Sequence, residues 1–309
     1  QIIRCPPRLT SDPLSAGRLT STGGRDSGLE VQAFAKLNLT LEVLARRADG
    51  YHEIASIIQT ISLHDVLTVE PSDSLSLTCN RKDLETEDNL AYRAATLLRD
   101  RAGTSDGARI SIEKRIPVAA GLGGGSSDAA ATLLGLRTLW APDFPDADIY
   151  RIASSLGSDV PFFIRGGTAL GQGRGDALEM LPLPVDRFGV IMATPEPVDA
   201  AKTSRLYGML GSANFSDGAR TDEVVRRIRA GEPLSGSLRN AFEGVAAQAY
   251  ASYNDACAIF GGSGGRVMLA GSGPALFKLV DDQRTADWTV GEIMESGSGA
   301  GAFAVALIG

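Results

Sequence analysis

The chain has 309 residues, of which 43% are hydrophobic and 22% are charged. This ordinary globular composition excludes a wholly disordered chain or a coiled coil, and the length favours two domains or one large one. Lys and Arg total 30 against 37 Asp and Glu, so the net charge of -7 argues against binding to nucleic acid or to an anionic membrane surface. No stretch approaches the roughly 18 uninterrupted apolar residues that a membrane span needs.

Residues 1–28 differ in composition from the rest of the chain. They are rich in Ser, Thr, Gly and Arg and have no sustained apolar period, so a disordered extension is the favoured interpretation and an organellar transit peptide the alternative. Cys5, Cys79 and Cys257 lie far apart and form no C-x-x-C pair. We therefore expect neither a zinc site nor a disulfide framework, and a reducing cytoplasmic location.

The first half of the chain mixes predicted strands and helices. Leu37, Leu39, Leu41 and Val43 alternate with polar residues and predict a half-buried strand within 31–43. A turn over 46–52 follows it. Apolar spacing then predicts two strands in 54–69, a helix over 89–101, a strand over 109–116 and helices over 128–140 and 149–155.

A break near residues 182–184, where two prolines flank Leu183, divides the chain. Beyond it we expect a strand at 188–192, several helical stretches, strands at 266–269 and 275–280, a helix at 285–296 and a strand at 302–308. This order predicts an α+β sandwich with helices on one face of an antiparallel sheet. The predicted fold class is α+β with two domains, 29–182 and 183–309.

Glycine is over-represented, with 36 residues, and its most informative cluster is the segment 117–127, here named the glycine loop. Four glycines in five positions let the backbone turn tightly and approach a ligand, and successive N–H groups can form an anion-binding nest. The helix that follows adds unpaired N–H donors and the positive end of its dipole. Phosphate binding is favoured over a plain connector, with Ser126 and Ser127 as candidates to bond phosphate oxygens or hold Mg²⁺. The candidate ATP-binding residues are Pro117, Val118, Ala119, Ala120, Gly121, Leu122, Gly123, Gly124, Gly125, Ser126 and Ser127.

The glycine loop matches neither of the two commonest phosphate loops. No Gly-Lys-Ser/Thr follows at Walker A spacing. Gly121 and Gly123 have the spacing of a dinucleotide fingerprint, but Ser126 holds the third glycine position. The strand before the loop alternates Ile110 and Ile112 with polar residues, whereas a central Rossmann strand is continuously apolar.

The glycine loop resembles the ATP-binding signature of the GHMP kinases (galactokinase, homoserine kinase, mevalonate kinase and relatives). Residues 35–41 and 47–52 are similar to the opening of one branch, the 4-diphosphocytidyl-2-C-methyl-D-erythritol kinases, and residues 157–163 resemble the aspartate motif of that branch. Residues 270–275 look like the third GHMP motif, a glycine-rich turn near the phosphates. The resemblance implies an N-terminal ATP-binding α+β domain, a C-terminal ferredoxin-like α/β sandwich, and a site between them.

The resemblance implies catalytic roles for two residues. The aspartate matching Asp159 is the family's catalytic base, and the lysine matching Lys36 lies beside it. Phosphoryl transfer needs a group that orients the attacking hydroxyl and a cation that stabilises charge on the transferring group. The plainer interpretations are that Asp159 caps a turn and that Lys36 is an edge-strand charge.

The resemblance also implies residues that bind the acceptor. His52 matches the residue that recognises the cytosine ring through hydrogen bonds, and Asn38 and Tyr51 match neighbouring positions. Tyr207 is a weaker candidate for a second aromatic that stacks on cytosine, against ordinary helix packing. Residues 240–243 depart from the Asn-Asp-Leu-Glu of many relatives, and we expect them to be structural.

These features lead to one main hypothesis and two alternatives. The main one is transfer of the γ-phosphoryl group of ATP, with Mg²⁺, to the 2-hydroxyl of 4-diphosphocytidyl-2-C-methyl-D-erythritol, in the non-mevalonate isoprenoid pathway. The first alternative is another GHMP kinase, with a homoserine- or mevalonate-like acceptor. The second is a non-catalytic nucleotide-binding relative. Beyond the candidates Ser126 and Ser127, no residue is assigned as a metal ligand.

Overall fold

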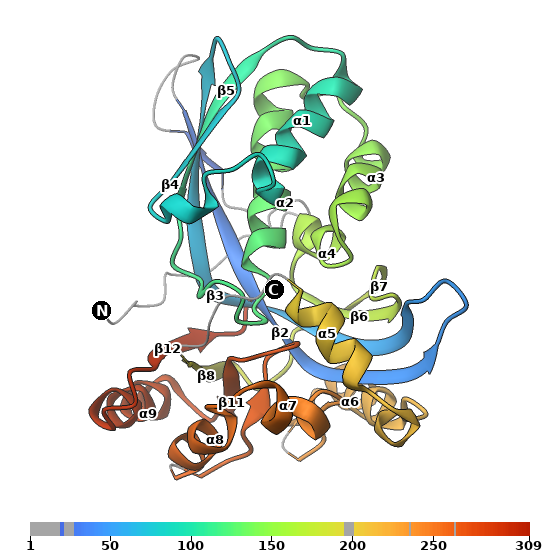
Figure 1. Ribbon diagram of the computed structural model, residues 1–309, viewed down its shortest axis with the longest axis vertical. Coiled ribbons are helices and arrows are strands. Elements are labelled where there is room, and N and C mark those ends of the chain that lie inside the picture. Colours follow the sequence, from blue (N-terminus) through green and yellow to red (C-terminus); the bar gives the residue numbers. More distant parts are fainter. Residues whose placement is uncertain (1–18, 22–27, 195–200, 235, 263) are drawn as a thin grey trace.

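The structure is a computed structural model in which residues 19–21, 28–194, 201–234, 236–262 and 264–309 are described. Two β-sheets form the framework of this described part, one of eight strands and one of four. Figure 1 shows the first sheet with its helices in the upper part of the molecule and the second sheet with its helices below.

A long antiparallel hairpin is the backbone of the eight-stranded sheet. It consists of β2 (Leu29–Arg46) and β3 (His52–Ser72). The other strands are β1 (Leu19–Ser21), β4 (Ser76–Cys79), β5 (Gly107–Glu113), β6 (Thr168–Gly173), β7 (Ala177–Leu181) and β9 (Arg239–Asn240). The order is β1-β2-β3-β5-β4, while β6 also pairs with β3, β7 with β6 and β9 with β2.

The expectation of two strands within 54–69 is wrong, because β3 runs through this region without a break. The strand instead bends: its register with β2 shifts from the pair Phe34–His64 to the pair Ala35–Ile61. Such irregularities kink a strand and increase its twist. As a result the second half of β3 pairs with β5 and the first half pairs with β6. The continuous β-branched sequence carries no signal for this change of partner.

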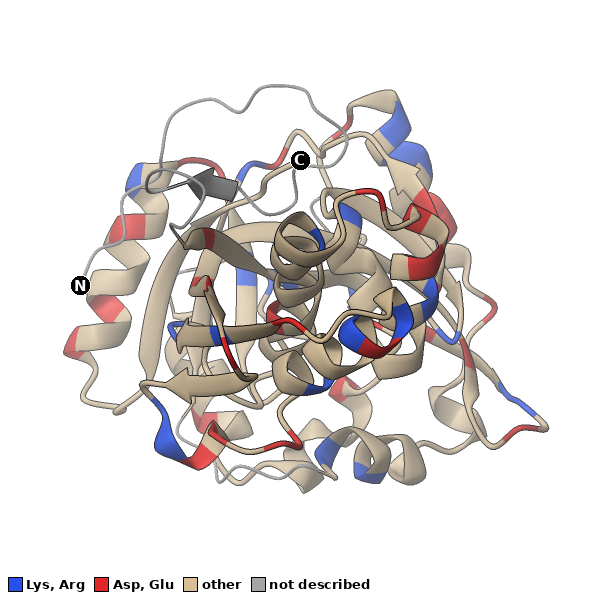
Figure 2. Ribbon diagram, turned by 90° about the horizontal axis from the view of Figure 1, so that it is seen from above, with Lys and Arg blue, Asp and Glu red and all other residues tan. Residues whose placement is uncertain are grey.

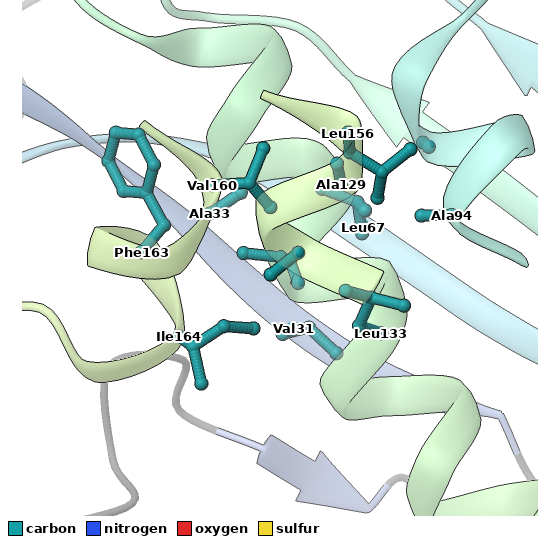
Figure 3. Packing of buried hydrophobic residues seen from close by; sticks show 14 of the residues in the cluster. Val31, Ala33, Leu67, Ala94, Ala129, Leu133, Leu156, Val160, Phe163 and Ile164 are labelled. Atoms are coloured by element: carbon teal, nitrogen blue, oxygen red, sulfur yellow. The ribbon is translucent and has the colours of Figure 1, made fainter. Parts of the chain in front are cut away.

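Within the described residues, four helices and one helical turn accompany the first sheet. They are η1 (Lys82–Leu84), α1 (Leu90–Ala102), α2 (Gly124–Trp140), α3 (Asp146–Leu156) and α4 (Val160–Arg165). The Ala-rich α2 packs closely on the sheet, and a Cβ at Gly135 would lie 3.3 Å from side-chain carbons of both Val31 and Val69. Figure 3 shows the interleaved core side chains, among them Val31, Ala33, Leu67, Ala94, Ala129, Leu133, Leu156, Val160, Phe163 and Ile164.

The second sheet has the βαββαβ order of a ferredoxin-like sandwich, as expected. Its strands are β8 (Phe188–Ala193), β10 (Met268–Leu269), β11 (Leu276–Val280) and β12 (Gly301–Ala306), all antiparallel in the order β10-β11-β8-β12. The helical segments of this half are α5 (Lys202–Met209), η2 (Ser212–Asn214), α6 (Ala219–Ala230), α7 (Glu243–Ala249), α8 (Tyr253–Gly261) and α9 (Gln283–Glu295). The predicted boundary at 182–184 falls between β7 and β8 and stays a prediction.

The two sheets meet along the long hairpin. Ile308 donates its backbone N–H to Thr60 at 3.0 Å, and Gln59 donates its side-chain amide to the Ile308 carbonyl at 2.8 Å. The strand β9, from the second half, pairs with β2. These contacts place the end of the chain against β3, so that the second half packs against the middle of the hairpin (Figure 1).

The half-buried character predicted for the first strand is wrong over its polar face. Leu37, Leu39, Leu41 and Val43 are buried as expected, but the intervening polar residues Lys36, Asn38, Thr40 and Glu42 are buried too. Part of the cover comes from α6, where the Thr221 N–H donates to Glu42 Oε2 at 2.7 Å. At Thr40 and Glu42 the polar side of this strand therefore faces other parts of the protein instead of open solvent.

The remaining general expectations concern the ends and the surface of the chain. Within the predicted extension 1–28, residues 19–21 form β1 against the start of β2, and residues 1–18 and 22–27 lie outside the described residues. Among the described helices, none is long and apolar enough to cross a membrane. Figure 2 shows acidic and basic residues interspersed over the helices and loops visible from that side.

Candidate active site

A cleft of about 1180 Å³ lies where the hairpin, the glycine loop, α4 and α5 come together. This volume exceeds the roughly 300–1000 Å³ of a pocket for one drug-sized ligand. The predicted site residues that line it are residues 117–126, Lys36, Asn38, Tyr51, His52, Asp159 and Tyr207. Ser127 is the exception, because it is buried beneath the loop and does not line the cleft.

The glycine loop passes directly into a helix. The helix α2 begins at Gly124, four residues before the predicted start at Asp128, and the Ser127 N–H closes its first turn on the Gly123 carbonyl at 2.9 Å. Gly124, Gly125 and Ser126 are therefore first-turn residues that line the cleft. Their N–H groups belong to the unpaired donors of a helix start, which favour an anion.

Two glycines of the loop have backbone conformations that a side chain would strain. Gly121 has φ +86° and Gly123 has φ +75°. A Cβ at Gly121 would lie 2.0 Å from the Ala270 carbonyl oxygen, and a Cβ at Gly123 would lie 2.7 Å from the Phe163 ring. These glycines are needed for close approach to the protein itself, which holds the loop in its curved shape.

Lys36 and Asp159 form an ion pair at the floor of the cleft. Lys36 Nζ lies 3.6 Å from Asp159 Oδ2, and the side chains are 6% and 39% exposed. Lys36 is buried and its backbone N–H donates to the Leu122 carbonyl of the glycine loop at 3.0 Å, which excludes the interpretation as an exposed edge charge. Asp159 precedes α4 without making a side-chain capping hydrogen bond, so the turn-cap interpretation fails as well. The lysine is buried, while the carboxylate is accessible from the cleft.

Asn38 holds the lysine in place. Its Oδ1 accepts from Lys36 Nζ at 2.5 Å, and its Nδ2 donates to Ser56 Oγ at 2.8 Å. Ser56 in turn donates to the Thr40 carbonyl at 2.6 Å. A chain of buried hydrogen bonds of this kind fixes the orientation of each member.

Aromatic side chains gather at the other end of the cleft. The rings of His52 and Tyr207 stack at 4.8 Å between centroids with an interplanar angle of 18°, and Phe215 meets His52 edge-on. Burial lowers the pKa of His52, and the positive charge of Arg46 lowers it further. Burial, with the negative charge of Asp159, raises the pKa of Tyr207 to about 12. His52 is therefore neutral and Tyr207 protonated at neutral pH.

Tyr51 is exposed at the mouth of this aromatic end. Tyr51 is 54% exposed. The guanidinium carbon of Arg174 lies over its ring, 4.6 Å from the ring centroid. The His52 and Tyr207 rings are in direct stacking contact, since their 4.8 Å separation is that of a single stacked pair. No third ring therefore fits between them.

The second glycine turn (residues 270–275) packs against the glycine loop. A Cβ at Gly271 would lie 2.7 Å from the Gly121 carbonyl oxygen and 3.0 Å from Lys36 Nζ. Asn240 holds this turn by donating its side-chain amide to the Leu269 and Gly271 carbonyls at 2.8 and 2.7 Å. Asn240 thus has the structural role expected for the segment 240–243, whereas Phe242 of that segment lines the cleft.

Comparison with known proteins identifies the family. The family described as "GHMP kinases N terminal domain" matches residues 89–167. A 4-diphosphocytidyl-2-C-methyl-D-erythritol kinase of Dehalococcoides mccartyi is 40% identical over 260 residues, which cover 84% of this chain and 92% of the relative. The enzyme of the same name from Pelotomaculum thermopropionicum is 41% identical over 262 residues, covering 82% and 90%. The chain belongs to the family of 4-diphosphocytidyl-2-C-methyl-D-erythritol kinases.

Solved structures agree with membership of this kinase family. The chain is similar to a crystal structure of 4-(cytidine 5'-diphospho)-2C-methyl-D-erythritol kinase, with a TM-score of 0.78 and 35% identity over 91% of this chain and 99% of that one. A homoserine kinase from Cytophaga hutchinsonii has a TM-score of 0.72 at 16% identity, over 94% of this chain and 98% of that one, and this likeness concerns the fold alone. The family places the chain among ATP-dependent small-molecule kinases with a two-domain α+β fold, as the motifs predicted.

Sequence reasoning missed a buried charge cluster under the glycine loop of this kinase. Lys114 Nζ lies 2.5 Å from Asp65 Oδ2 and 2.7 Å from Asp128 Oδ2. Burial, helped by the charge of Asp65, raises the pKa of Asp128 to about 7, although Lys114 opposes the shift. Asp65 Oδ1 also accepts from the backbone N–H of Ile116 at 2.8 Å. The only sequence signal was a lysine directly after a strand, which reads as an ordinary surface charge.

Proposed function

We propose that this chain transfers the γ-phosphoryl group of ATP to the 2-hydroxyl of 4-diphosphocytidyl-2-C-methyl-D-erythritol, in the non-mevalonate isoprenoid pathway. The observation that carries the proposal is the position of the Lys36–Asp159 pair. It lies in one cleft with the glycine loop and with the aromatic end at His52. A donor, an acceptor and the reacting groups can therefore meet in a single site.

The nucleotide occupies the end of the cleft formed by the glycine loop. Its phosphates face the first-turn N–H groups of α2 at residues 124–126, where the helix dipole adds positive potential. The apolar side chains of Leu84, Leu90 and Val118 line the cleft beside the loop and suit a purine ring. This end is a cradle made mainly of backbone, which suits a triphosphate.

The reacting hydroxyl lies against Asp159. The carboxylate accepts the hydroxyl proton as the oxygen forms its bond to the γ-phosphorus, and the bond from that phosphorus to the β,γ-bridging oxygen breaks to release ADP. Lys36 supplies a fixed positive charge beside the reacting oxygen and the transferring group. Because Asn38 holds the lysine, this charge is in place before the substrate arrives.

The cytosine of the acceptor is read at the aromatic end. A neutral histidine presents one N–H donor and one acceptor nitrogen, and cytosine offers an amino group and acceptor atoms on its edge. The lowered pKa of His52 keeps its ring in this neutral form. Tyr207 supports the histidine ring by stacking on it, and the exposed Tyr51 ring lies at the mouth of the same end of the cleft.

The polar atoms of the cleft fit Mg²⁺. This ion prefers oxygen ligands and is held in kinase sites by one or two protein oxygens together with substrate phosphates. The Ser126 hydroxyl is an oxygen of this kind at the phosphate end. Mg²⁺ held there would neutralise charge on the phosphates of ATP.

The two alternatives account for less of the site. A homoserine- or mevalonate-like acceptor has no base and gives no role to the stacked His52 and Tyr207. A protein that only binds nucleotide has no need for a carboxylate facing a buried lysine. We also propose a reducing, cytoplasmic location, since Cys79 and Cys257 are both free thiols.

The test is ADP release with Mg-ATP and a panel of acceptors. Turnover is expected with 4-diphosphocytidyl-2-C-methyl-D-erythritol and not with homoserine, mevalonate or galactose. Turnover with one of the other alcohols would support the kinase activity and refute the proposed acceptor. ATP binding without turnover on any of them would favour the non-catalytic alternative.

A further inference from the structure

Lys202 joins the two glycine-rich segments that form the phosphate end of the cleft. It lies in the first turn of α5 and is 7% exposed. Its ammonium donates to the Ala119 carbonyl at 2.5 Å, in the glycine loop, and to the Gly273 carbonyl, in the second glycine turn. No motif of the sequence pointed to this residue, and its partners are far from it in the chain.

The position of the Ala119 carbonyl depends on an unusual backbone conformation. Ala119 has φ 55°, and it is the one residue other than glycine with positive φ in the described part of the chain. This conformation is unfavourable for a residue with a Cβ and persists where surrounding contacts impose it. The charge-assisted hydrogen bond from Lys202 is a contact of that kind.

A second contact docks the start of α5 on the same turn. The hydroxyls of Thr203 and Ser272 lie 3.0 Å apart. The glycine loop and the second glycine turn also meet directly, since the Ala275 N–H donates to the Ala120 carbonyl at 3.2 Å. Lys202 thus reinforces an existing junction between the two halves of the chain, and it adds a positive charge there.

The charge of Lys202 matters because carbonyl oxygens repel phosphate oxygens. Two carbonyls at the rim of a polyphosphate cradle would oppose an anionic ligand unless a cation engaged them. Lys202 binds both oxygens and leaves the N–H groups of the neighbouring helix start to face the phosphates.

We propose that Lys202 is a positioning residue for the glycine loop, which fixes the cradle for the ATP phosphates by tying Ala119 to Gly273. The inference rests on the proposed function of the cleft as an ATP site. It assigns Lys202 to the phosphates and not to the adenosine part. Its removal should therefore weaken binding of ATP and ADP while leaving adenosine binding unchanged.

The experiment measures dissociation constants of ATP, ADP and adenosine by calorimetry, without any acceptor, for the wild type and Lys202→Met. The expected result is a loss of roughly 10- to 100-fold for ATP and ADP, the size of a lost hydrogen bond to a charged group, with adenosine within twofold. Lys202→Arg, which keeps the charge, should recover most of the loss. Arg205→Met, an exposed cation on the same helix, is the matched control and should change nothing.

Two outcomes would overturn the inference and can be told apart. If the wild type prefers ATP to adenosine and Lys202→Met keeps that preference, Lys202 has no positioning role. If the wild type itself binds ATP no more tightly than adenosine, the phosphate site fails and the inference fails with it. Lys202→Gln, which keeps two N–H donors on a neutral group, repeats the test should the Met variant not fold, with the same loss of preference expected.

Discussion

His52 and Tyr207 stack ring on ring across the junction of the two halves, with centroids 4.8 Å apart and an angle of 18° between the planes. His52 begins β3 of the long hairpin, and Tyr207 lies on α5 of the second half. Tyr207 also meets Phe242 edge-on at 4.9 Å. The orientation of the histidine is therefore set by the packing of a helix that is remote in sequence.

The first prediction separates hydrogen bonding by His52 from stacking. His52→Phe keeps a ring against Tyr207 and removes both ring nitrogens, so we expect KM for the cytidylyl acceptor to rise roughly 10- to 100-fold. KM for ATP should stay within twofold, because the change is at the other end of the cleft. Tyr207→Phe, which keeps the stack, is the control and should have a much smaller effect. Equal rises in both KM values for His52→Phe would argue against a role in reading cytosine.

The second prediction concerns the pH dependence of the same residue. Because burial lowers the pKa of His52 from its ordinary 6.5, the neutral ring persists below pH 6.5. KM for the acceptor should be constant from pH 8 down to about 6.5 and rise only at more acidic pH, as the ring becomes charged. The rise should be absent in His52→Phe. A rise in the wild type that begins above pH 7 would contradict the neutral assignment.

The third prediction tests Asp159 as the general base. Asp159→Asn removes proton acceptance but keeps the shape, so kcat should fall roughly 10²–10⁴-fold. Binding of ATP, measured without acceptor, should change little, because the carboxylate is not part of the glycine loop. Asp143→Asn, at an exposed carboxylate outside the cleft, serves as the control. Near-normal turnover of Asp159→Asn would remove this residue from the mechanism.

The fourth prediction uses two adjacent glycines of the loop. A Cβ at Gly124 would meet Ile116 and Lys114 at 3.1 Å, so a valine there would disturb the protein behind the loop. A Cβ at Gly125 would have only Leu90 nearby, at 3.9 Å. Gly125→Val should therefore raise KM for ATP about tenfold or more with little change in Tm, whereas Gly124→Val should lower Tm as well. Gly291→Val, whose Cβ would meet nothing outside its own helix within 4 Å, controls for valine in a helix. An unchanged KM for ATP in Gly125→Val would refute the cradle.

The fifth prediction follows from the raised pKa of Asp128. The unfolded chain loses this proton near pH 3.8, but the folded protein keeps it to about pH 7. The stability that Asp128 contributes should therefore decrease as the pH rises from about 4 to 7 and stay constant above. Asp128→Asn, which mimics the protonated form, lacks this loss. The difference in Tm between Asp128→Asn and wild type should therefore be at least about 2 °C more in favour of the variant at pH 8 than at pH 5. A constant difference would show that Asp128 is ionised throughout.

The local patterns of the chain determined most of its elements and its chemistry. Apolar spacing places α1, α3 and the strands of the second sheet to within a few residues, because burial on one face repeats with the period of the element. The glycine loop, Lys36 and Asp159 could be named from short motifs, since each motif is a continuous stretch with its own backbone requirements. Membership of the kinase family followed from the same residues.

Tertiary structure alone decided how the polar face of β2 is covered, how β3 changes partners, and where Lys202 and Tyr207 lie. Glu42 and Thr40 look like solvent-facing residues of an alternating strand until α6 packs over them. Lys202 reads as a surface charge until two carbonyls from distant turns converge on it. Burial and hydrogen bonding of these groups depend on segments far apart in the chain, and no local period encodes which segment will cover another.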